Sequence, residues 1–398
     1  MKTTCRILIA TALAVVSLTA GAQSWGPLNL EELKKETQRR ADRNLPPLAG
    51  IKPDDAREAV AALTSLEPDV WAAAWSKVGE RYLAQARAAE GNNAKAEART
   101  AYYNAWHAFN TARWPTEKNS PGKLQAYRQA LDAFERYGRL LEPAIEKVRI
   151  PFEGKELVGY LRLPAGVRPA PLVFGINGLD SRKEDVAANT EEYLKRGIGV
   201  FAIDMPGTGE APVLIDVGSE RMFSRALDWL QTRPEIDAKR IVVQGRSWSG
   251  YWAAIMAYTE KDRIRGAVVQ GVGVHDYFSA EWQKKAFSSR EYLFDMLPAR
   301  SAVYGTKTLE DFLAYGPRLS LLTRGLLDQP SAPMLLVNGE RDTQQPISDL
   351  YLMMKHGDPK DAWVNPAGGH MGRSQQWSSR MIADRVVMPW IVRHLDAK

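Results

Sequence analysis

The sequence predicts an α/β protein, in which a mostly parallel sheet carries helices on both faces and a separate helical region precedes it. Two observations support this fold class. From Val148 to the C-terminus, apolar segments of strand length alternate with helical segments, which is typical of a covered parallel sheet. Between residues 54 and 146, apolar and aromatic residues recur only at helical spacing. The 398 residues are enough for one large domain and a smaller one.

The first 22 residues have the pattern of an export signal. Lys2 and Arg6 precede an apolar run at residues 7–18, and the small residues Ala20-Gly21-Ala22 follow it. We therefore expect a signal peptide at 1–22, cleaved after Ala22, and a periplasmic or secreted mature protein. The apolar run is short for a membrane span, so no stable membrane insertion is expected after cleavage. An uncleaved N-terminal anchor is the alternative.

Charge and composition exclude several other functions. The net charge of +6 falls to +4 without Lys2 and Arg6, and the basic residues are spread along the chain, so no nucleic-acid surface is predicted. The single cysteine, Cys5, lies within the predicted signal, so the mature chain would have neither a disulfide nor a thiol nucleophile. No cofactor or metal is predicted, and the glycine turn at 207–209 is not followed by a P-loop lysine. The expected partner is a small-molecule substrate, and a homodimer is left open.

A helical N-terminal domain is expected at residues 23–146. It begins with a polar segment that predicts a short helix and a linker up to Pro53, and four longer helices follow. Aromatic residues recur on one face of these helices: Trp71, Trp75, Tyr82, Tyr102, Trp106, Phe109, Tyr127 and Phe134. This spacing predicts a core between antiparallel helices, in which His107 is expected to be structural. The absence of a constant repeat length argues against a repeat protein.

The domain at 147–398 is expected to form the sheet. An alternating pattern at 148–164, with a turn at Glu153-Gly154, predicts an antiparallel hairpin. The following strands are expected at 172–176, 200–203, 241–244, 264–274 and 334–338, with helices at 186–195 and 219–232. A sheet of this kind has right-handed crossovers and places its functional groups at the carboxyl ends of its strands.

A lid insertion at residues 275–330 interrupts this alternation. It is mainly helical in pattern and rich in aromatic side chains: Tyr277, Phe278, Trp282, Phe287, Tyr292, Phe294, Phe312 and Tyr315. Because the insertion leaves the sheet at the carboxyl end of a strand and is too long for an ordinary loop, we expect it to cover the functional site.

The segment Arg240–Tyr251 predicts a short strand that turns sharply into a helix. A serine on such a turn, with small residues two positions before and after it, is the nucleophile elbow of the α/β-hydrolase fold. Gly245 precedes Ser247 in this way, while Ser249 stands at the second position in place of glycine. Ser249 is the weaker nucleophile candidate, because Tyr251 would fall where its own turn needs a small residue.

A serine nucleophile needs a general base and an acid that orients the base. In this fold the order along the chain is serine, acid, histidine. Asp342 follows the strand at 334–338 in a glycine turn, and His370 lies in a glycine-rich loop after the last strand. Glu340 and Asp349 are the alternatives for the acid. The other histidines of this domain lie on predicted helices or before any suitable acid: His275, His356 and His394.

The tetrahedral intermediate of acyl transfer needs N–H donors aimed at its oxyanion. One is predicted to be the N–H of Trp248, the residue after the nucleophile. The other comes from the loop at 177–181, where Gly178 lets the backbone approach closely and the Leu179 N–H is the candidate donor. The Gly178 N–H is the alternative.

Three further motifs accompany the elbow sequence G-R-S-W-S-G-Y and the helical domain. They are the hairpin I-P-F-E-G-K-E-L-V-G-Y-L-R-L-P, the loop N-G-L-D-S-R-K-E and the turn D-M-P-G-T-G-E. With these motifs, the chain from about Asp54 to the C-terminus resembles the FrsA-type esterases and the dihydropseudooxynicotine hydrolases. The resemblance implies an α/β-hydrolase core, a helical domain that closes over the site, and a catalytic triad of Ser247, Asp342 and His370.

The resemblance also suggests a second type of reaction. Some members of the family cleave a carbon–carbon bond next to a ketone, with the participation of an additional acid from the lid. Glu281 is the position to compare with that auxiliary acid. Asn177 stands where the family usually has a glycine.

These observations together predict an exported serine hydrolase that works through an acyl-enzyme. The expected target is an ester, or a carbon–carbon bond next to a ketone, in a small and partly apolar substrate. A peptidase or amidase of the prolyl-peptidase type is one alternative, although the large N-terminal propeller of that group would show repeated strands. A non-catalytic binding protein on a hydrolase scaffold is the other.

Overall fold

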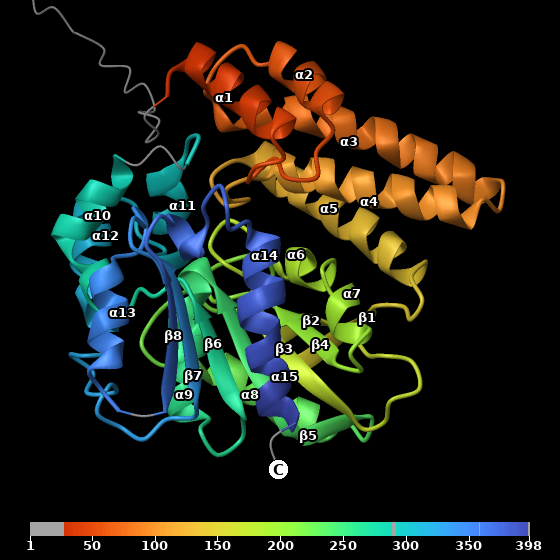
Figure 1. The fold of residues 1–398 in the computed structure, drawn as a ribbon. Coiled ribbons are helices and arrows are strands. Elements are labelled where there is room, and N and C mark those ends of the chain that lie inside the picture. The colour runs from red at the N-terminus through yellow and green to blue at the C-terminus, as the bar shows by residue number, and fades with distance from the viewer. Residues whose placement is uncertain (1–27, 289–291, 358, 397–398) are drawn as a thin grey trace, which may run out of the picture.

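The computed structural model describes residues 28–288, 292–357 and 359–396 (Figure 1). In these ranges the chain forms a helical domain that lies across one end of a large sheet. The predicted signal peptide at 1–22 lies outside the described residues. No helix in the described ranges has the length and apolar character needed to cross a membrane.

The helical domain follows the predicted pattern. Its helices are α1 Leu30–Asp42, α2 Pro53–Ala61, α3 Pro68–Gly91, α4 Lys95–Ala112 and α5 Pro121–Arg139. Local signals set their starts: Asn29 and Glu32 form a capping box on α1, and proline occupies the first turn of α2, α3 and α5. The side chains of Trp75, Phe109 and Phe134 are completely buried between the helices. The aromatic face is therefore a core, as its spacing predicts.

Within the described residues, eight strands form one sheet in the order β1-β2-β4-β3-β5-β6-β7-β8. They are β1 Glu146–Phe152, β2 Lys155–Arg162, β3 Ala170–Ile176, β4 Gly199–Ile203, β5 Ile236–Arg246, β6 Gly266–Gln270, β7 Met334–Gly339 and β8 Lys360–Asn365. β1 and β2 form the predicted antiparallel hairpin, β2 also runs antiparallel to β4, and the remaining neighbours are parallel. The predicted α/β-hydrolase fold is confirmed. β1 begins at Glu146, one residue before the position at which the second domain is expected to start.

Helices cover both faces of the sheet (Figure 1). On one face, α8 Arg221–Gln231 and α9 Gly250–Thr259 pack against strand residues such as Phe174 and Val243. On the other face, α15 Met388–Asp396 packs against their chain neighbours Val173 and Val242. Successive strand residues point to opposite faces, so one continuous apolar run fills both cores. Shorter helices complete the layers: α6 Lys183–Ala187, α7 Glu191–Leu194, α13 Ile347–Met354 and α14 Ser379–Ile382.

Two predicted elements differ from the structure. The helix expected at 186–195 is split into α6 and α7, because the buried Thr190 between them directs its hydroxyl to the Ala187 carbonyl. The strand expected at 264–274 ends at Gln270, because Gly271 leaves the extended conformation with a φ of 95° and the Val274 N–H donates to the Asp349 carboxylate instead of to a neighbouring strand. Such competition between side chain and backbone leaves no trace in the apolar pattern.

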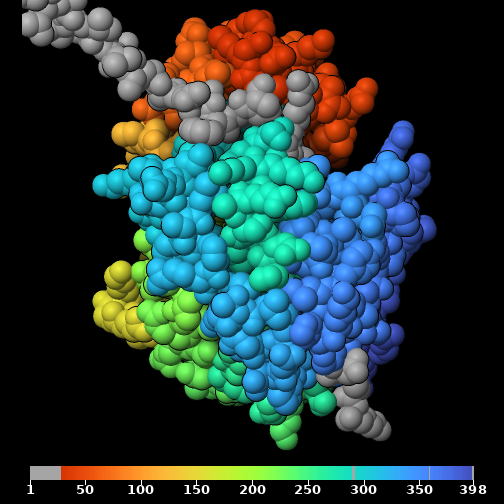
Figure 2. Space-filling view, turned by 90° about the vertical axis from the view of Figure 1, so that its left-hand side faces the viewer, coloured from red at the N-terminus to blue at the C-terminus, as the bar shows by residue number. Residues whose placement is uncertain are grey.

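The insertion between β6 and β7 lies directly beside the helical domain, as Figure 2 shows. Its elements are the 3-10 helix η2 Asp276–Phe278, the helices α10 Ala280–Phe287, α11 Met296–Tyr304 and α12 Leu309–Tyr315, and the 3-10 helix η3 Gly316–Leu319. The ring centroids of Phe294 and Trp71 are 4.8 Å apart, and Lys123 Nζ lies 2.5 Å from the Asp295 carboxylate. The insertion and the helical domain are therefore packed together over the carboxyl ends of the strands.

Candidate active site

Ser247 lies at a sharp turn between β5 and α9. Its backbone φ of 55° is in the left-handed region, which is strained for a residue with a side chain and is typical of a nucleophile elbow. A Cβ at Gly245 would collide with the Ser249 carbonyl oxygen. A Cβ at Gly250 would likewise collide with the Gly271 carbonyl oxygen. Glycine is therefore needed at positions 245 and 250, whereas position 249 accommodates a serine.

Ser247, His370 and Asp342 lie in one hydrogen-bonded line. Ser247 Oγ is 2.7 Å from His370 Nε2, and His370 Nδ1 is 3.0 Å from Asp342 Oδ2. Asp342 Oδ1 accepts the N–H groups of Gln344 and Gln345 at 2.8 and 3.0 Å. The side chains of His370 and Asp342 are both buried. The structure thus brings together the three residues that the sequence selects from the ends of three different strands.

The environment of Asp342 holds its carboxylate in the charged form. Burial alone would raise its pKa, but attraction to His370 and hydrogen bonds from His370 and two backbone N–H groups lower the pKa below its ordinary value. An ionised Asp342 favours the His370 tautomer with the proton on Nδ1, which leaves Nε2 free to accept a proton from Ser247. The three groups are therefore arranged for general-base chemistry.

The other acids and histidines that the sequence offers are engaged elsewhere. Asp349 accepts the N–H groups of residues 274–277 at 2.7 to 3.2 Å, so it anchors the start of the insertion. Glu340 accepts the Tyr351 hydroxyl at 2.8 Å. Neither of these carboxylates contacts His370. The remaining histidines of the domain have other partners: His275 contacts the Ser320 hydroxyl, His356 contacts Asp328, and His394 contacts the Trp390 carbonyl.

The loop after β3 approaches the nucleophile closely. A Cβ at Gly178 would lie only 3.1 Å from Ser247 Cβ. The Gly178 N–H already donates to Ser181 Oγ at 2.9 Å. No described residue accepts the Leu179 N–H, and the Trp248 N–H lies in the first turn of a 3-10 helix, where a helix offers no internal acceptor. Leu179 and Trp248 therefore present the two N–H groups that remain available beside Ser247.

Asn177 ties this loop to its surroundings. Its buried side-chain Nδ2 donates to the carbonyls of Gly178 and Ser181 at 2.7 and 2.9 Å, and its Oδ1 accepts the Met205 N–H at 3.0 Å. The Ser249 hydroxyl donates to the Asn177 carbonyl oxygen. The two positions at which the chain carries a polar residue in place of the expected glycine are thus in contact, and they link the elbow to the loop.

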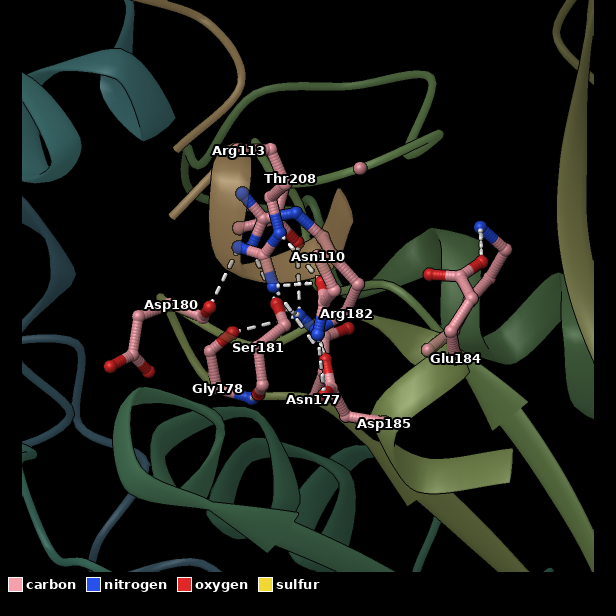
Figure 3. A network of polar contacts seen from close by, with 12 residues as sticks. Asn110, Arg113, Asn177, Gly178, Asp180, Ser181, Arg182, Glu184, Asp185 and Thr208 are labelled. Atoms are coloured by element: carbon pink, nitrogen blue, oxygen red, sulfur yellow. Dashed lines mark hydrogen bonds and ion pairs between the residues drawn. The ribbon is translucent and has the colours of Figure 1, made fainter. Parts of the chain in front are cut away.

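The helical domain holds the same loop from the outside, through the polar network of Figure 3. Arg113, at the end of α4, is buried and donates to the Asp180 carbonyl at 2.7 Å. The Arg113 guanidinium also donates to the Asn110 side-chain oxygen at 2.6 and 2.8 Å. Asn110 in turn donates to the Asp185 carboxylate at 2.9 Å. The network therefore joins the helical domain to both ends of the segment 180–185.

A buried ion pair makes a second connection. Arg182 pairs with Glu117 of the helical domain and donates to the Leu179 carbonyl at 2.9 Å. Glu117 also accepts the Gly209 N–H at 3.0 Å, so it reaches the loop after β4 as well. Burial opposes its ionisation, but the attraction of Arg182 and Arg113 lowers the pKa of Glu117 to about 2. The family resemblance implies that the helical domain closes over the site, but the sequence does not indicate these contacts with the backbone around Leu179.

Lys183 forms the third connection between the two domains. It is completely buried, and its Nζ lies 2.7 Å from Glu184, 3.0 Å from Asp204 and 2.7 Å from Glu210. The same nitrogen contacts the Tyr127 hydroxyl of α5 at 3.3 Å. Burial raises the pKa of Glu184 to about 7. Because none of these groups reaches Ser247 or His370, we interpret the cluster as structural.

A narrow pocket opens at Ser247 and His370. It has a volume of about 10 Å³, roughly the space of one water molecule. Its walls come from the elbow, the loop after β3, the turn after Asp342 and the insertion: Leu179, Ser247, Trp248, Tyr277, Tyr292, Arg300, Gln344, Gln345 and His370. A substrate can therefore enter only when side chains of these walls move. Among the described residues, no group of three or more His, Cys, Asp and Glu side chains could hold a metal ion.

Glu281, the position compared with an auxiliary acid, is not among the residues that line this pocket. It lies in the first turn of α10 and is exposed. The buried side chain of that helix is Gln283, which contacts the pocket residue Arg300. The structure therefore does not bring Glu281 to the triad, because the register of α10 turns it outward.

The sequence profile of the FrsA-like proteins, described as Esterase FrsA-like, matches residues 56–368. The chain belongs to the FrsA-like esterase family. Its relatives include Esterase FrsA of Vibrio cholerae serotype O1, which is 28% identical over 292 residues that cover 71% of this chain and 68% of the relative. Esterase FrsA of Pectobacterium atrosepticum is 25% identical over 324 residues, or 79% of this chain and 76% of the relative.

Solved structures share the fold at low sequence identity. 2,6-Dihydroxy-pseudo-oxynicotine hydrolase matches with a TM-score of 0.73 and 22% identity, over 87% of this chain and 94% of that one. AbyA5 matches with a TM-score of 0.69 and 22% identity, over 92% of this chain and 93% of that one. The predicted family is confirmed, and the chain is a hydrolase with the α/β-hydrolase fold.

Proposed function

We propose that the protein is a serine esterase that works through an acyl-enzyme at Ser247. The observation that carries this proposal is the continuous hydrogen-bond line from Ser247 through His370 to Asp342. Ser247 Oγ attacks the substrate carbonyl while His370 Nε2 takes its proton. Asp342 stabilises the imidazolium that forms. His370 then protonates the leaving alcohol, and a water activated by the same imidazole releases the acid.

The N–H groups of Trp248 and Leu179 stabilise the oxyanion in this proposal. Each N–H stands beside Ser247, and neither has an acceptor among the described residues. Donors that are fixed before the reaction are effective because they need no reorganisation when charge develops on the oxygen. The hydrogen bonds of Asn177 and Arg182 to the loop supply that fixation. Gly178 is not a donor in this proposal, because its N–H is bonded to Ser181. Its lack of a side chain lets the loop lie close to Ser247.

An ester is the substrate that the site supports best. In the family members that cleave a carbon–carbon bond next to a ketone, an additional acid from the lid takes part. Glu281 is exposed, and the described residues that line the pocket include no carboxylate. The curated relatives also bear the name esterase. Tyr277, Tyr292 and Trp248 give the pocket an aromatic wall, which suits a small, partly apolar acyl or alcohol group.

Export to the periplasm or the medium is a separate part of the proposal. It rests on the charged, apolar and small-residue pattern that ends at Ala22. Cell fractionation of the expressed full chain, followed by mass determination of its N-terminus, tests this part. We expect a mature chain that starts at Gln23 outside the cytoplasm. A chain that keeps Met1 and remains in the cytoplasm would contradict it.

Labelling with a fluorophosphonate probe tests the enzymatic part of the proposal. We expect the wild-type protein to be labelled and Ser247→Ala to be unlabelled, with a folded state confirmed by circular dichroism. A panel of aryl esters, acylated ketones and short peptides then separates esterase, carbon–carbon hydrolase and peptidase. Equal labelling of both proteins, or none of either, would support a non-catalytic protein on this scaffold.

A further inference from the structure

Buried lysine and arginine side chains in the described part of the chain are paired with carboxylates, with one exception. Six of them lie within ion-pair distance of an acidic side chain: Arg40, Arg113, Lys123, Arg162, Arg182 and Lys183. This pairing is expected, because a charge that is removed from water is destabilising unless an opposite charge compensates it. Arg300 is only 2% exposed, and no described carboxylate lies within ion-pair distance of it.

Arg300 lies close to the nucleophile, so its lack of a described carboxylate partner bears on substrate binding. Arg300 lies on α11 and lines the pocket that contains Ser247. Its Nη1 donates to Gln283 Oε1 at 2.7 Å, and its guanidinium carbon lies 6.0 Å from the ring centre of Tyr277. Its Nε–H is buried and has no acceptor among the described residues. Among the described residues, the side chains in contact with this positive charge are therefore a neutral amide and aromatic rings.

A ligand that pairs with Arg300 has to meet definite chemical requirements. A guanidinium presents its N–H groups as a planar fork, which matches the two oxygens of a carboxylate. Gln283 engages one nitrogen and fixes the orientation of the group, while the Nε–H is left for a ligand. The described residues of the pocket wall include no acidic side chain that would repel an anion. The pocket is also too small in this form for a bulky anion without movement of its walls.

We propose that Arg300 binds a carboxylate of the substrate, so that the enzyme acts on small esters that carry a free carboxylate in their acyl or alcohol part. This inference rests on the proposed esterase function of Ser247. The carboxylate compensates the buried charge and orients the ester carbonyl toward Ser247 Oγ. Gln283 is a positioning residue in this arrangement, because it holds the guanidinium and does not contact the substrate.

Paired substrates measure the effect. One pair is para-acetoxybenzoate and its methyl ester, which differ by a charge in the alcohol part. The other is the mono-para-nitrophenyl ester of adipic acid and para-nitrophenyl hexanoate, which differ by a charge in the acyl part. For the wild-type protein, we expect kcat/KM to favour the charged member of at least one pair by roughly 10- to 100-fold, as for a hydrogen bond to a charged group.

The Arg300→Met variant removes the charge and keeps much of the length of the side chain. We expect it to lose most of the preference, with a ratio of charged to neutral substrate within about threefold of unity. Arg318→Met is the matched control, because Arg318 also lies in the insertion but is 58% exposed and pairs with Asp216 on the surface. The control should keep the wild-type ratio. A wild-type protein without preference in either pair, or an Arg300→Met protein that keeps it, would overturn the proposal.

Two further measurements test the proposal even if the Arg300→Met variant does not fold. Arg300→Lys keeps the charge without the fork, and we expect an intermediate ratio. In the wild-type protein, benzoate should inhibit hydrolysis of the neutral esters competitively at concentrations where benzamide has no effect, and equal inhibition by both would contradict the carboxylate site. Failure of the esterase proposal has a different signature, because Ser247→Ala would then hydrolyse all four esters as fast as the wild-type protein.

Discussion

The two walls of the pocket are built in opposite ways. The wall formed by the loop after β3 is fixed by polar contacts: Asn177 bonds it from the inside, and Arg113 and Arg182 bond it to the helical domain from the outside. The wall formed by the insertion is mainly aromatic, with Arg300 as its one described cation. This difference between the polar and the aromatic wall matches the different roles of the two walls in catalysis. Donors for an oxyanion must be immobile, whereas a substrate wall must open and select.

The largest effect is expected at the nucleophile, where both walls meet. We predict that Ser247→Ala lowers kcat on aryl esters by roughly 10⁴- to 10⁶-fold, with intact secondary structure. Asp342→Asn should lower kcat by roughly 10⁴-fold, because the amide no longer favours the required His370 tautomer. Steady-state kinetics with each purified variant provides the measurement. A fall of less than about tenfold for Ser247→Ala would remove this residue from the mechanism.

A smaller effect is expected on the polar wall. Asn177→Gly removes the side chain that bonds the loop to Gly178, Ser181 and Met205. We predict a fall in kcat of roughly 10- to 100-fold with a smaller change in KM, because the Leu179 N–H would then be less well fixed for the oxyanion. A loss confined to KM would show that the loop serves substrate binding instead.

The buried ion pair between Glu117 and Arg182, which connects this wall to the helical domain, is expected to stabilise the fold. Glu117→Gln leaves the buried Arg182 without its carboxylate, and we predict a loss on the order of 3 kcal/mol in the free energy of unfolding at neutral pH. Since the pKa of Glu117 is lowered to about 2, its ion pair stabilises the fold above the ordinary carboxyl pKa, and this contribution disappears as the pH falls toward 2. Urea unfolding at several pH values should therefore show that the difference between variant and wild type narrows in acid.

A matched control distinguishes the buried pair from ordinary surface pairs. Glu153→Gln removes an exposed carboxylate that pairs with Arg221. We expect its unfolding curve to match the wild type at neutral pH, because exposed ion pairs contribute little. If Glu117→Gln behaves in the same way, the helical domain does not hold the loop through this contact.

The smallest effect is expected behind the polar wall, in the contact of Ser249 with Asn177. Ser249→Gly restores the glycine of the usual elbow pattern and removes one hydrogen bond to the loop. We predict a fall in kcat of about 2- to 10-fold, in keeping with one neutral hydrogen bond. The double variant with Asn177→Gly should lose less than the product of the two single effects, because both act on the same loop. Independent effects would contradict that coupling.

The sequence allowed the fold and the residues of the triad to be predicted because both leave local patterns. Apolar runs mark the strands, small residues at 245 and 250 mark the elbow, and glycine-rich turns follow the strands before Asp342 and His370. The ion pair between the two domains could not be predicted. Arg182 and Glu117 are 65 residues apart, and an arginine in a loop has no sequence pattern that identifies its partner.

The sequence also did not show which face of helix α10 in the insertion points toward the interior. Glu281 was the position to compare with an acid of the lid, yet the exposed Glu281 and the buried Gln283 are only two residues apart on α10. A short helix does not show from its pattern which of its polar residues faces the interior. Among the described residues, Arg300 likewise has no carboxylate within ion-pair distance; this depends on its neighbours in space, so only the folded chain shows it.

The central claim, that Ser247 is the nucleophile of an esterase, is tested most directly by mapping the adduct of a fluorophosphonate probe. The wild-type protein is labelled to completion, digested and sequenced by mass spectrometry across the peptide that contains both serines of the elbow. We predict one equivalent of adduct per chain, located on Ser247. An adduct on Ser249, or no adduct on a protein that hydrolyses esters, would contradict the account.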